Sequence, residues 1–200
     1  MENLLTTARK VARFGTWFGG GLLIAAALII GVEVVIRKAF DMSIGGADEL
    51  SGFALAIGSA WSFAFALLDR AHVRIDSLYV VLPVRICAVL DILGLAALIL
   101  FMGLVSWFGF GVFAKSAELG ARTMSPLATP LVVPQGLWVA GLILFMLVAV
   151  LLLARAFMAL LSGEPAVVQQ LIGSRTVVQE IEEELRDVAQ RRSSTEGNGP

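Results

Sequence analysis

The sequence predicts an all-α integral membrane protein with four transmembrane helices. Three observations point to this fold class: 58% of the 200 residues are hydrophobic, only 16% are charged, and the mean hydropathy is +0.87. Soluble domains are roughly 45–50% apolar and about 25% charged. A soluble chain of this size could not bury so much apolar surface. The same composition excludes a disordered chain, and the single Cys87 excludes an internal disulfide.

The first three spans are the stretches from which charged residues are missing. About 20 apolar residues cross a hydrocarbon layer of roughly 30 Å, and the backbone groups of such a segment must be satisfied within it, which requires a helix. Residues 14–32, 50–68 and 92–114 meet this condition. The first run is too long for a signal-peptide core and no small-residue cleavage site follows it, so we expect an uncleaved signal anchor.

The fourth span lies in the uncharged run over residues 123–154, whose first part is broken by three prolines. Pro126, Pro130 and Pro134 recur every four residues. Proline lacks an amide hydrogen and disfavours helix in the residue before it. We therefore expect an extended entry segment over residues 125–133. Pro134 then lies in the first turn of a helix, where proline is tolerated, and that helix runs to about Ala154.

The distribution of lysine and arginine predicts the orientation of the spans. Basic residues are enriched in the short loops on the cytoplasmic side of a membrane. With both termini inside, the inner segments contain Arg9, Lys10, Arg13, Arg70, Arg74, Arg85 and Arg155. The outer loops then contain Arg37, Lys38, Lys115 and Arg122. We therefore expect both termini in the cytoplasm.

Two further helices are predicted outside the spans. Apolar residues at positions 75, 78, 79 and 82 follow helical spacing, which indicates a short interfacial helix over residues 76–82 between spans 2 and 3. The composition changes after Arg155, so we divide the chain into a transmembrane domain, residues 1–155, and a cytoplasmic tail, residues 156–200. An apolar stripe at positions 178, 181, 185 and 188 predicts an amphipathic helix near residues 174–192, either solvated or paired with a partner helix.

Small and aromatic residues within the spans indicate how the helices pack. Gly15 and Gly19 form a G-x-x-x-G pair, a spacing that lets membrane helices approach closely. Trp17 and Trp138 lie near span ends, where tryptophan anchors a helix at the membrane interface. The remaining tryptophans, at positions 61 and 107, are in mid-span and are expected to pack against helices or lipid.

Charged residues inside a membrane are functional candidates by default. Glu33 lies at the end of the first span and Asp91 at the start of the third, and we interpret both as helix-end charges that reach water. Glu33 is one helical turn from Arg37, so the two side chains can pair. The single histidine, His72, has no further ligand residues nearby in sequence at the spacing that a metal site requires. The sequence thus predicts no enzyme, no cofactor and no metal site, and the net charge of −1 gives no sign of nucleic-acid binding.

Several short motifs occur in a distinctive order between the spans. Arg37-x-x-Phe40 follows the first span, Asp48-Glu49-Leu50 opens the second, and the loop after it contains Arg70 and His72-x-Arg74-x-Asp76. Over about residues 14–155 this order resembles the small permease subunit of tripartite ATP-independent periplasmic (TRAP) transporters. In that family a periplasmic substrate-binding protein captures an organic acid, and a large permease subunit moves it inward with sodium.

The resemblance implies a partnership and a location. The chain would be a multi-pass protein of the bacterial inner membrane, embedded in lipid. Its partners would be the large permease subunit and the periplasmic substrate-binding protein. The family places the sodium and substrate sites in the large subunit, and the small subunit resembles a fixed scaffold for it. The absence of acids deep in the four spans of this chain agrees with that division.

By the same resemblance, eight charged or polar residues receive expected roles. Asp48 and Glu49 pair with the large subunit or contact the binding protein, and Glu33 and Arg37 form an outer polar cluster with them. On the inner side, the second loop is fixed against the large subunit or lipid headgroups by Arg70, His72, Arg74 and Asp76. The alternative role for all eight is to position the ends of helices within the chain.

Other functions remain open from the residues alone. A generic membrane scaffold for an unrelated complex has the same composition. A self-oligomerising small transporter or channel would need a polar face along one span, and Ser51, Ser59 and Ser62 in the second span are the nearest approach to one. A membrane enzyme or redox protein is disfavoured by the single cysteine and single histidine.

Overall fold

A computed structural model describes residues 2–43, 45–70 and 82–173. Over these residues the chain forms α1 (Glu2–Phe40), α2 (Ala47–Leu68), α4 (Val84–Leu119), α5 (Val132–Leu161) and α6 (Pro165–Ile172). The first four are long and apolar enough to cross a membrane. The prediction of an all-α membrane protein with four spans is therefore confirmed.

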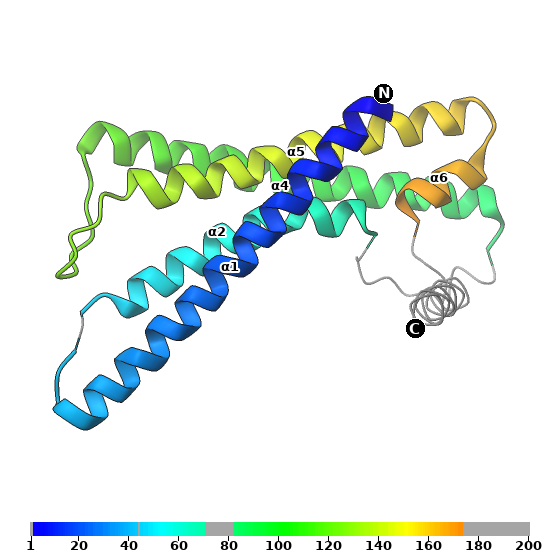
Figure 1. The fold of residues 1–200 in the computed structure, drawn as a ribbon. Coiled ribbons are helices and arrows are strands. Elements are labelled where there is room, and N and C mark those ends of the chain that lie inside the picture. The colour runs from blue at the N-terminus through cyan, green and yellow to red at the C-terminus, as the bar shows by residue number, and fades with distance from the viewer. Residues whose placement is uncertain (1, 44, 71–81, 174–200) are drawn as a thin grey trace, which may run out of the picture.

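The four long helices form two antiparallel pairs that cross one another. Figure 1 shows α1 beside α2 and α4 beside α5, with α2 and α5 meeting at the crossing. Within their apolar windows, α2 and α5 are also the most buried of the four helices. Away from the crossing the pairs diverge toward the end that carries the α1–α2 and α4–α5 connections, which we call the loop end (Figure 1). The start of α1 and the short helix α6 lie at the opposite end, the terminal end. That this end faces the cytoplasm stays a prediction.

The α1–α2 pair packs through small residues. Buried positions of α1 recur every seven residues at Ala12, Gly19, Ala26 and Glu33, the repeat of a helix that keeps one seam against a partner. A methyl group added at Gly19 would lie 2.8 Å from the carbonyl oxygen of Gly58 in α2. The close approach that the glycine spacing predicted is thus confirmed at Gly19, where the two backbones touch.

Trp61 of α2 fills the crossing between the two helix pairs. A methyl group added at Gly15 of α1 or at Gly141 of α5 would lie 2.8 Å from its ring. The indole nitrogen donates a hydrogen bond to the carbonyl oxygen of Leu137, 2.9 Å away. The ring therefore contacts α1 and α5 from opposite sides, and helix packing is confirmed for this tryptophan. By contrast, Trp107 is 76% exposed on the outer face of α4.

The hydrophobic core extends from the crossing to the terminal end. It joins Leu95 of α4, Phe145 and Val148 of α5, and Val168 and Ile172 of α6. The short helix α6 begins at Pro165, a residue whose fixed backbone angle suits the first turn. Because its apolar side chains are buried among α4 and α5, α6 covers the ends of both helices.

All four long helices extend beyond the charge-free runs that identified them, and α2 does so at its start, at Ala47 rather than Leu50. The first continues through Arg37 to Phe40, the third spans Val84–Leu119, and the fourth runs past Ala154 to Leu161. Charge-free length measures the hydrocarbon layer, whereas a helix can continue into the headgroup region, where charged side chains reach water. The predicted placement of Pro134 in the first turn of the fourth helix is confirmed.

Two predicted helices fall outside the described residues. The interfacial helix over residues 76–82 falls almost entirely on residues 71–81, and the amphipathic helix lies beyond residue 173. The division of the chain into a transmembrane domain (1–155) and a cytoplasmic tail (156–200) stays a prediction.

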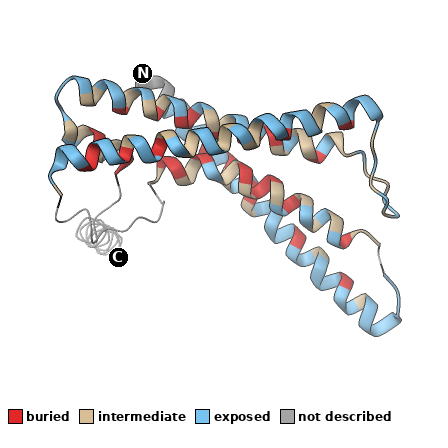
Figure 2. Cartoon of the chain, turned by 180° about the vertical axis from the view of Figure 1, so that it is seen from behind, coloured by how far each residue is buried: buried red, intermediate tan, exposed pale blue. Residues whose placement is uncertain are grey.

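The outer faces of α1 and α4 are apolar and exposed. Figure 2 shows both helices largely in the colour of exposed residues. On α4 the exposed apolar side chains include Leu100, Phe101, Leu104, Trp107 and Phe108. Such contiguous apolar surface requires a lipid or protein environment, as expected for a multi-pass membrane protein.

Candidate functional site

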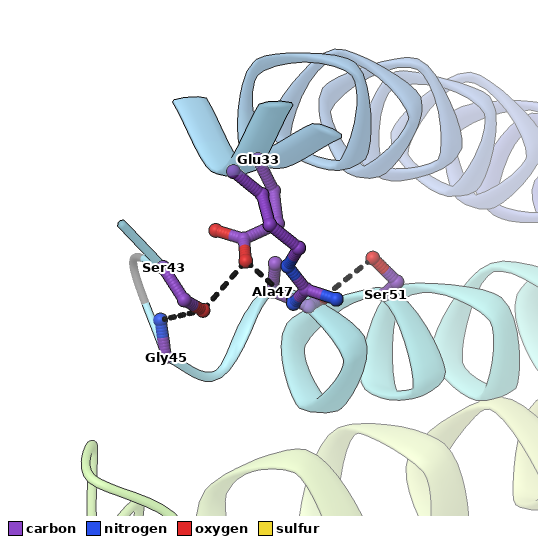
Figure 3. A network of polar contacts seen from close by, with 6 residues as sticks. Glu33, Ser43, Gly45, Ala47 and Ser51 are labelled. Atoms are coloured by element: carbon purple, nitrogen blue, oxygen red, sulfur yellow. Dashed lines mark hydrogen bonds and ion pairs between the residues drawn. The ribbon is translucent and has the colours of Figure 1, made fainter. Parts of the chain in front are cut away.

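A polar cluster at the loop end is centred on the carboxylate of Glu33. Arg37 donates a hydrogen bond and ion pair to Glu33 Oε1 at 2.7 Å. The hydroxyl of Ser43 donates to the same oxygen at 2.6 Å, and the amide of Gly45 donates to that hydroxyl at 3.2 Å. Figure 3 shows the carboxylate pointing from α1 toward the connection with α2. The cluster therefore fixes this connection to the end of α1.

The environment of Glu33 differs from the sequence-based expectation. We predicted a helix-end charge that reaches water, but Glu33 is only 5% exposed, so that prediction is wrong. Its pairing with Arg37 is confirmed. A buried carboxylate requires hydrogen-bond donors, and the short bond from Ser43 is of the charge-assisted kind. The Arg37 side chain is 63% exposed, so solvent screens its part of the interaction.

The two acidic residues that open α2 lie in different environments. Asp48 is exposed, whereas both carboxylate oxygens of Glu49 are shielded from solvent. Each belongs to the first turn of the helix, where negative charge interacts favourably with the helix dipole. In the next turn, the Ser51 hydroxyl donates to the carbonyl oxygen of Ala47 at 2.7 Å (Figure 3). Asp48 is thus available to a partner at this end of the molecule, and Glu49 is turned toward its own chain.

Hydroxyl groups from the α4–α5 connection face Glu49. The hydroxyls of Ser125, Thr129 and Thr123 lie close enough to act on its carboxylate. No donor in the described part of the chain meets strict hydrogen-bond geometry with either carboxylate oxygen. Hydroxyl hydrogens rotate freely about the C–O bond, so the three groups can turn their hydrogens toward the carboxylate. Together they form a polar lining beside a carboxylate whose two oxygens are shielded from solvent by the chain itself.

These hydroxyls belong to a short hairpin, residues 121–131, which we call the proline hairpin. Its two arms are joined by an antiparallel bridge between Arg122 and Pro130, and the amide of Thr123 donates to the carbonyl oxygen of Thr129 at 3.0 Å. The amide of Thr129 returns a bond to the Thr123 hydroxyl at 2.9 Å. The extended entry segment predicted over residues 125–133 is therefore a closed turn, and α5 begins after it at Val132.

The proline hairpin lies against the glycines that precede α2. Gly45 and Gly46 have φ angles of 66° and 113°, values that favour glycine. A methyl group at Gly45 would lie 3.1 Å from the ring of Pro126, and one at Gly46 would clash with Leu127. Two connections far apart in sequence therefore meet at the loop end.

Of the four inner-loop candidates, the structure describes one, Arg70 at the terminal end. Arg70 follows α2 with a φ of 56° and is half-buried, while His72, Arg74 and Asp76 lie outside the described residues. Asp91 of α4 was expected to reach water, but it has no exposed surface, so that expectation is wrong. Among the described residues, no three acidic, histidine or cysteine side chains gather as metal ligands would.

Sequence reasoning missed four residues of the loop end: Ser43, Thr123, Ser125 and Thr129. Their signal was weak, because hydroxyl residues are common in loops and turns. The one available clue was position, since Ser125 and Thr129 each precede a proline of the hairpin. The structure brings Glu33 and Arg37 together and places Glu49 against the hairpin. The wider outer cluster of these residues with Asp48 stays a prediction.

Comparison with known proteins identifies one family. Residues 26–159, more than half of the chain, match the model for the DctQ component of tripartite ATP-independent periplasmic transporters. The match extends from the middle of α1 to near the end of α5 and so includes the crossing and the loop end. No curated protein and no solved structure shows significant similarity to the chain.

Proposed function

Because the chain belongs to the family of DctQ components of tripartite ATP-independent periplasmic transporters, we propose that it is the non-catalytic small subunit of a sodium-driven organic acid importer. In this role it is a scaffold for the large permease subunit in the bacterial inner membrane. The family match confirms the resemblance in the motifs between the spans. It makes the chain a component of a membrane transporter, with a large permease subunit and a binding protein as implied partners.

The observation that carries the scaffold proposal is the exposed apolar surface of α1 and α4. The two helix pairs pack on one another at their crossing, mainly through α2 and α5, and the outer faces of the other two helices are left uncovered. Lipid can cover such a surface, but a large permease subunit in the same complex also needs a membrane-embedded contact. We assign this contact to α1 and α4.

The hydroxyl groups of the spans support a scaffold rather than a channel. A self-oligomerising channel would use Ser51 and Ser59 as a polar face, but both hydroxyls donate at 2.7 Å to carbonyl oxygens of their own helix. Ser106 of α4 does the same at 2.8 Å. Hydroxyls bonded in this way are satisfied within their helix and present little polarity to a pore.

At the loop end, the contact with partners is assigned to exposed groups. Asp48 and Arg37 are exposed there, and a charged rim residue accelerates association and selects the correct partner. We assign these two to the large subunit or the binding protein. Glu33 and Glu49 act within the chain. At the other end, Arg70, His72, Arg74 and Asp76 fix the second loop against the large subunit or lipid headgroups in this proposal.

Reconstitution into liposomes tests the function. We expect uptake of an organic acid only when this subunit, the large permease subunit and the binding protein are combined under an inward sodium gradient. The small subunit alone should transport nothing, and uptake by the purified chain alone would contradict the scaffold role.

Copurification tests the assigned contact. Asp48→Lys should reduce recovery of the large subunit or of the binding protein. The control is Glu118→Lys, which reverses another exposed acid at the loop end. Equal recovery with both variants would exclude Asp48 as a contact.

A further inference from the structure

The two helix pairs diverge toward the loop end, and the proline hairpin crosses the space between them. Figure 1 shows the hairpin leaving the ends of α4 and α5 and extending toward the start of α2. At the crossing, α2 and α5 are held by Trp61. Between the crossing and the loop end, the hairpin connects the two helix pairs, because Pro126 and Leu127 contact the glycines that precede α2. The hairpin is therefore placed to set how far the pairs spread.

The contact of the hairpin with α2 has an apolar part and a polar part. Pro126 and Leu127 lie against Gly45 and Gly46, where no side chain intervenes. One helical turn further on, the hydroxyls of Ser125, Thr129 and Thr123 face the carboxylate of Glu49. The apolar contact alone is small, and Leu127 is still 45% exposed. The polar part is thus a substantial share of the contact.

Glu49 is suited to hold this hairpin because its charge is withdrawn from water. Neither carboxylate oxygen has exposed surface. A carboxylate in this state is stable only if donors compensate for its lost hydration, and the hairpin hydroxyls are the groups around it. Removal of the hairpin would expose the carboxylate, and removal of the carboxylate would leave the hydroxyls without a charged acceptor.

We propose that Glu49 is a positioning residue that holds the proline hairpin against the start of α2 and thereby fixes the spread of the two helix pairs. This role goes beyond the proposed function, because it concerns the shape of the subunit itself. It also separates Glu49 from Asp48, its exposed neighbour in sequence. The carboxylate of Glu49 is covered by its own chain, so a partner meets the hairpin rather than this acid.

Limited proteolysis of the full-length subunit tests the proposal without any transport assay. Arg122 is an exposed trypsin site within the proline hairpin. Its guanidinium donates to the carbonyl oxygen of Ala128 at 3.0 Å when the hairpin is closed. Cleavage after Arg122, followed by mass spectrometry on protein in detergent or nanodiscs, reports the fraction of open hairpin. We expect Glu49→Ala to accelerate this cleavage about tenfold, because the hydroxyls lose their interaction with a charged group. The matched control Asp48→Ala should cleave at the wild-type rate.

Two further variants identify the groups through which Glu49 acts. Ser125→Ala should also accelerate cleavage, and the double variant with Glu49→Ala should add little to the single changes, because the same interaction is lost in each. Glu49→Gln keeps a hydrogen-bonding side chain and should restore part of the protection. Additive effects of the two alanine changes would show that Glu49 acts by another route and would overturn the proposal.

A second cleavage site controls for loss of the fold. Arg155 lies inside α5 and should stay protected in every variant. If Glu49→Ala also makes the chain cleavable after Arg155, the fold itself is lost in that variant. The proposal is then tested by Glu49→Gln and Ser125→Ala. Cleavage after Arg122 at the wild-type rate in both of them, or in Glu49→Ala with a protected Arg155, overturns the proposal. Since the subunit is tested alone, neither result depends on whether the transporter assignment is correct.

Discussion

The Ser43 hydroxyl and the Glu33 carboxylate are joined by a hydrogen bond of 2.6 Å at the end of α1. The same oxygen of Glu33 also accepts from Arg37 at 2.7 Å. The two donors differ in their surroundings, since the guanidinium extends into solvent and the hydroxyl belongs to the connection that leads to α2. A serine that sequence reasoning overlooked is therefore a main partner of the buried acid.

Replacement of Ser43 should destabilise the subunit more than replacement of Arg37. Ser43→Ala removes a hydrogen bond to a buried charge, at a cost of about 1.5–3 kcal/mol. Arg37→Ala removes a solvent-screened ion pair, at a cost of about 0–1 kcal/mol. Reversible unfolding in detergent mixtures measures both values, with Lys38→Ala as the neutral control. A larger loss from Arg37→Ala would mean that the exposed ion pair, rather than the hydroxyl, stabilises Glu33.

Adjacent glycines of α1 should respond in opposite ways to alanine. At Gly19 the added methyl group meets the backbone of Gly58, which cannot rotate away, so we expect a loss of about 1–3 kcal/mol. At Gly20 nothing lies within 4 Å of such a methyl group, and the change should be neutral or stabilise the helix by up to about 1 kcal/mol. The same unfolding assay compares the two variants. Similar values for both would contradict the close contact between α1 and α2.

Trp61→Phe should lower the stability of the subunit, whereas Trp107→Phe should leave it unchanged. The first change removes the hydrogen bond to Leu137 and part of a ring packed between glycines, which together cost about 1–3 kcal/mol. The second changes an exposed ring on the outer face of α4, where effects stay within about 0.5 kcal/mol. Thermal unfolding of the isolated subunit is the appropriate measurement, because a partner could cover Trp107 in the complex. Equal shifts would exclude Trp61 as the main contact at the crossing.

Gly46→Ala should open the proline hairpin, and Gly163→Ala should not. Both glycines have positive φ angles, so both variants acquire backbone strain of about 1–3 kcal/mol. Only at Gly46 does the added methyl group clash with a side chain of the hairpin, that of Leu127. We expect faster trypsin cleavage after Arg122 in the first variant alone. If the two variants cleave at the same rate, the hairpin does not depend on space at Gly46.

Truncation should measure the contribution of α6 to the stability of the subunit. A chain that ends after Gly173 keeps Val168 and Ile172 in the core and is the reference form. A chain that ends after Leu161 loses both side chains, and with them about 3–5 kcal/mol of burial. Unfolding of the two truncated forms in the same detergent tests this difference. Equal stability would show that α6 contributes nothing to the core.

The spans were predictable from sequence because a hydrocarbon layer excludes charge over a fixed length. That reasoning predicted four helices, but it ended each one at the first charged residue. The first helix passes through Glu33 and Arg37, which form an ion pair, and ends at Phe40. Burial of Glu33 and Asp91 was not predictable, since it depends on which helix packs beside each acid.

The loop end shows the same limit at the scale of single residues. Asp48 and Glu49 are adjacent in sequence and identical in charge, yet a helix rotates by about 100° per residue and turns them to different surroundings. Which of the two is covered depends on a hairpin about eighty residues further along the chain. The prolines predicted that this segment is not helical. Its contact with Gly45 and Gly46 is a tertiary contact, which neither local sequence predicts.

The indole of Trp61 has a mechanical consequence. No side chain separates the ring from the backbone at Gly15 or at Gly141, and Phe18 of α1 adds an edge-on ring contact with a centroid distance of 5.9 Å. The three helices that meet there therefore resist sliding past one another. In the scaffold role proposed above, this resistance to sliding would let the small subunit keep its shape while a partner moves against it.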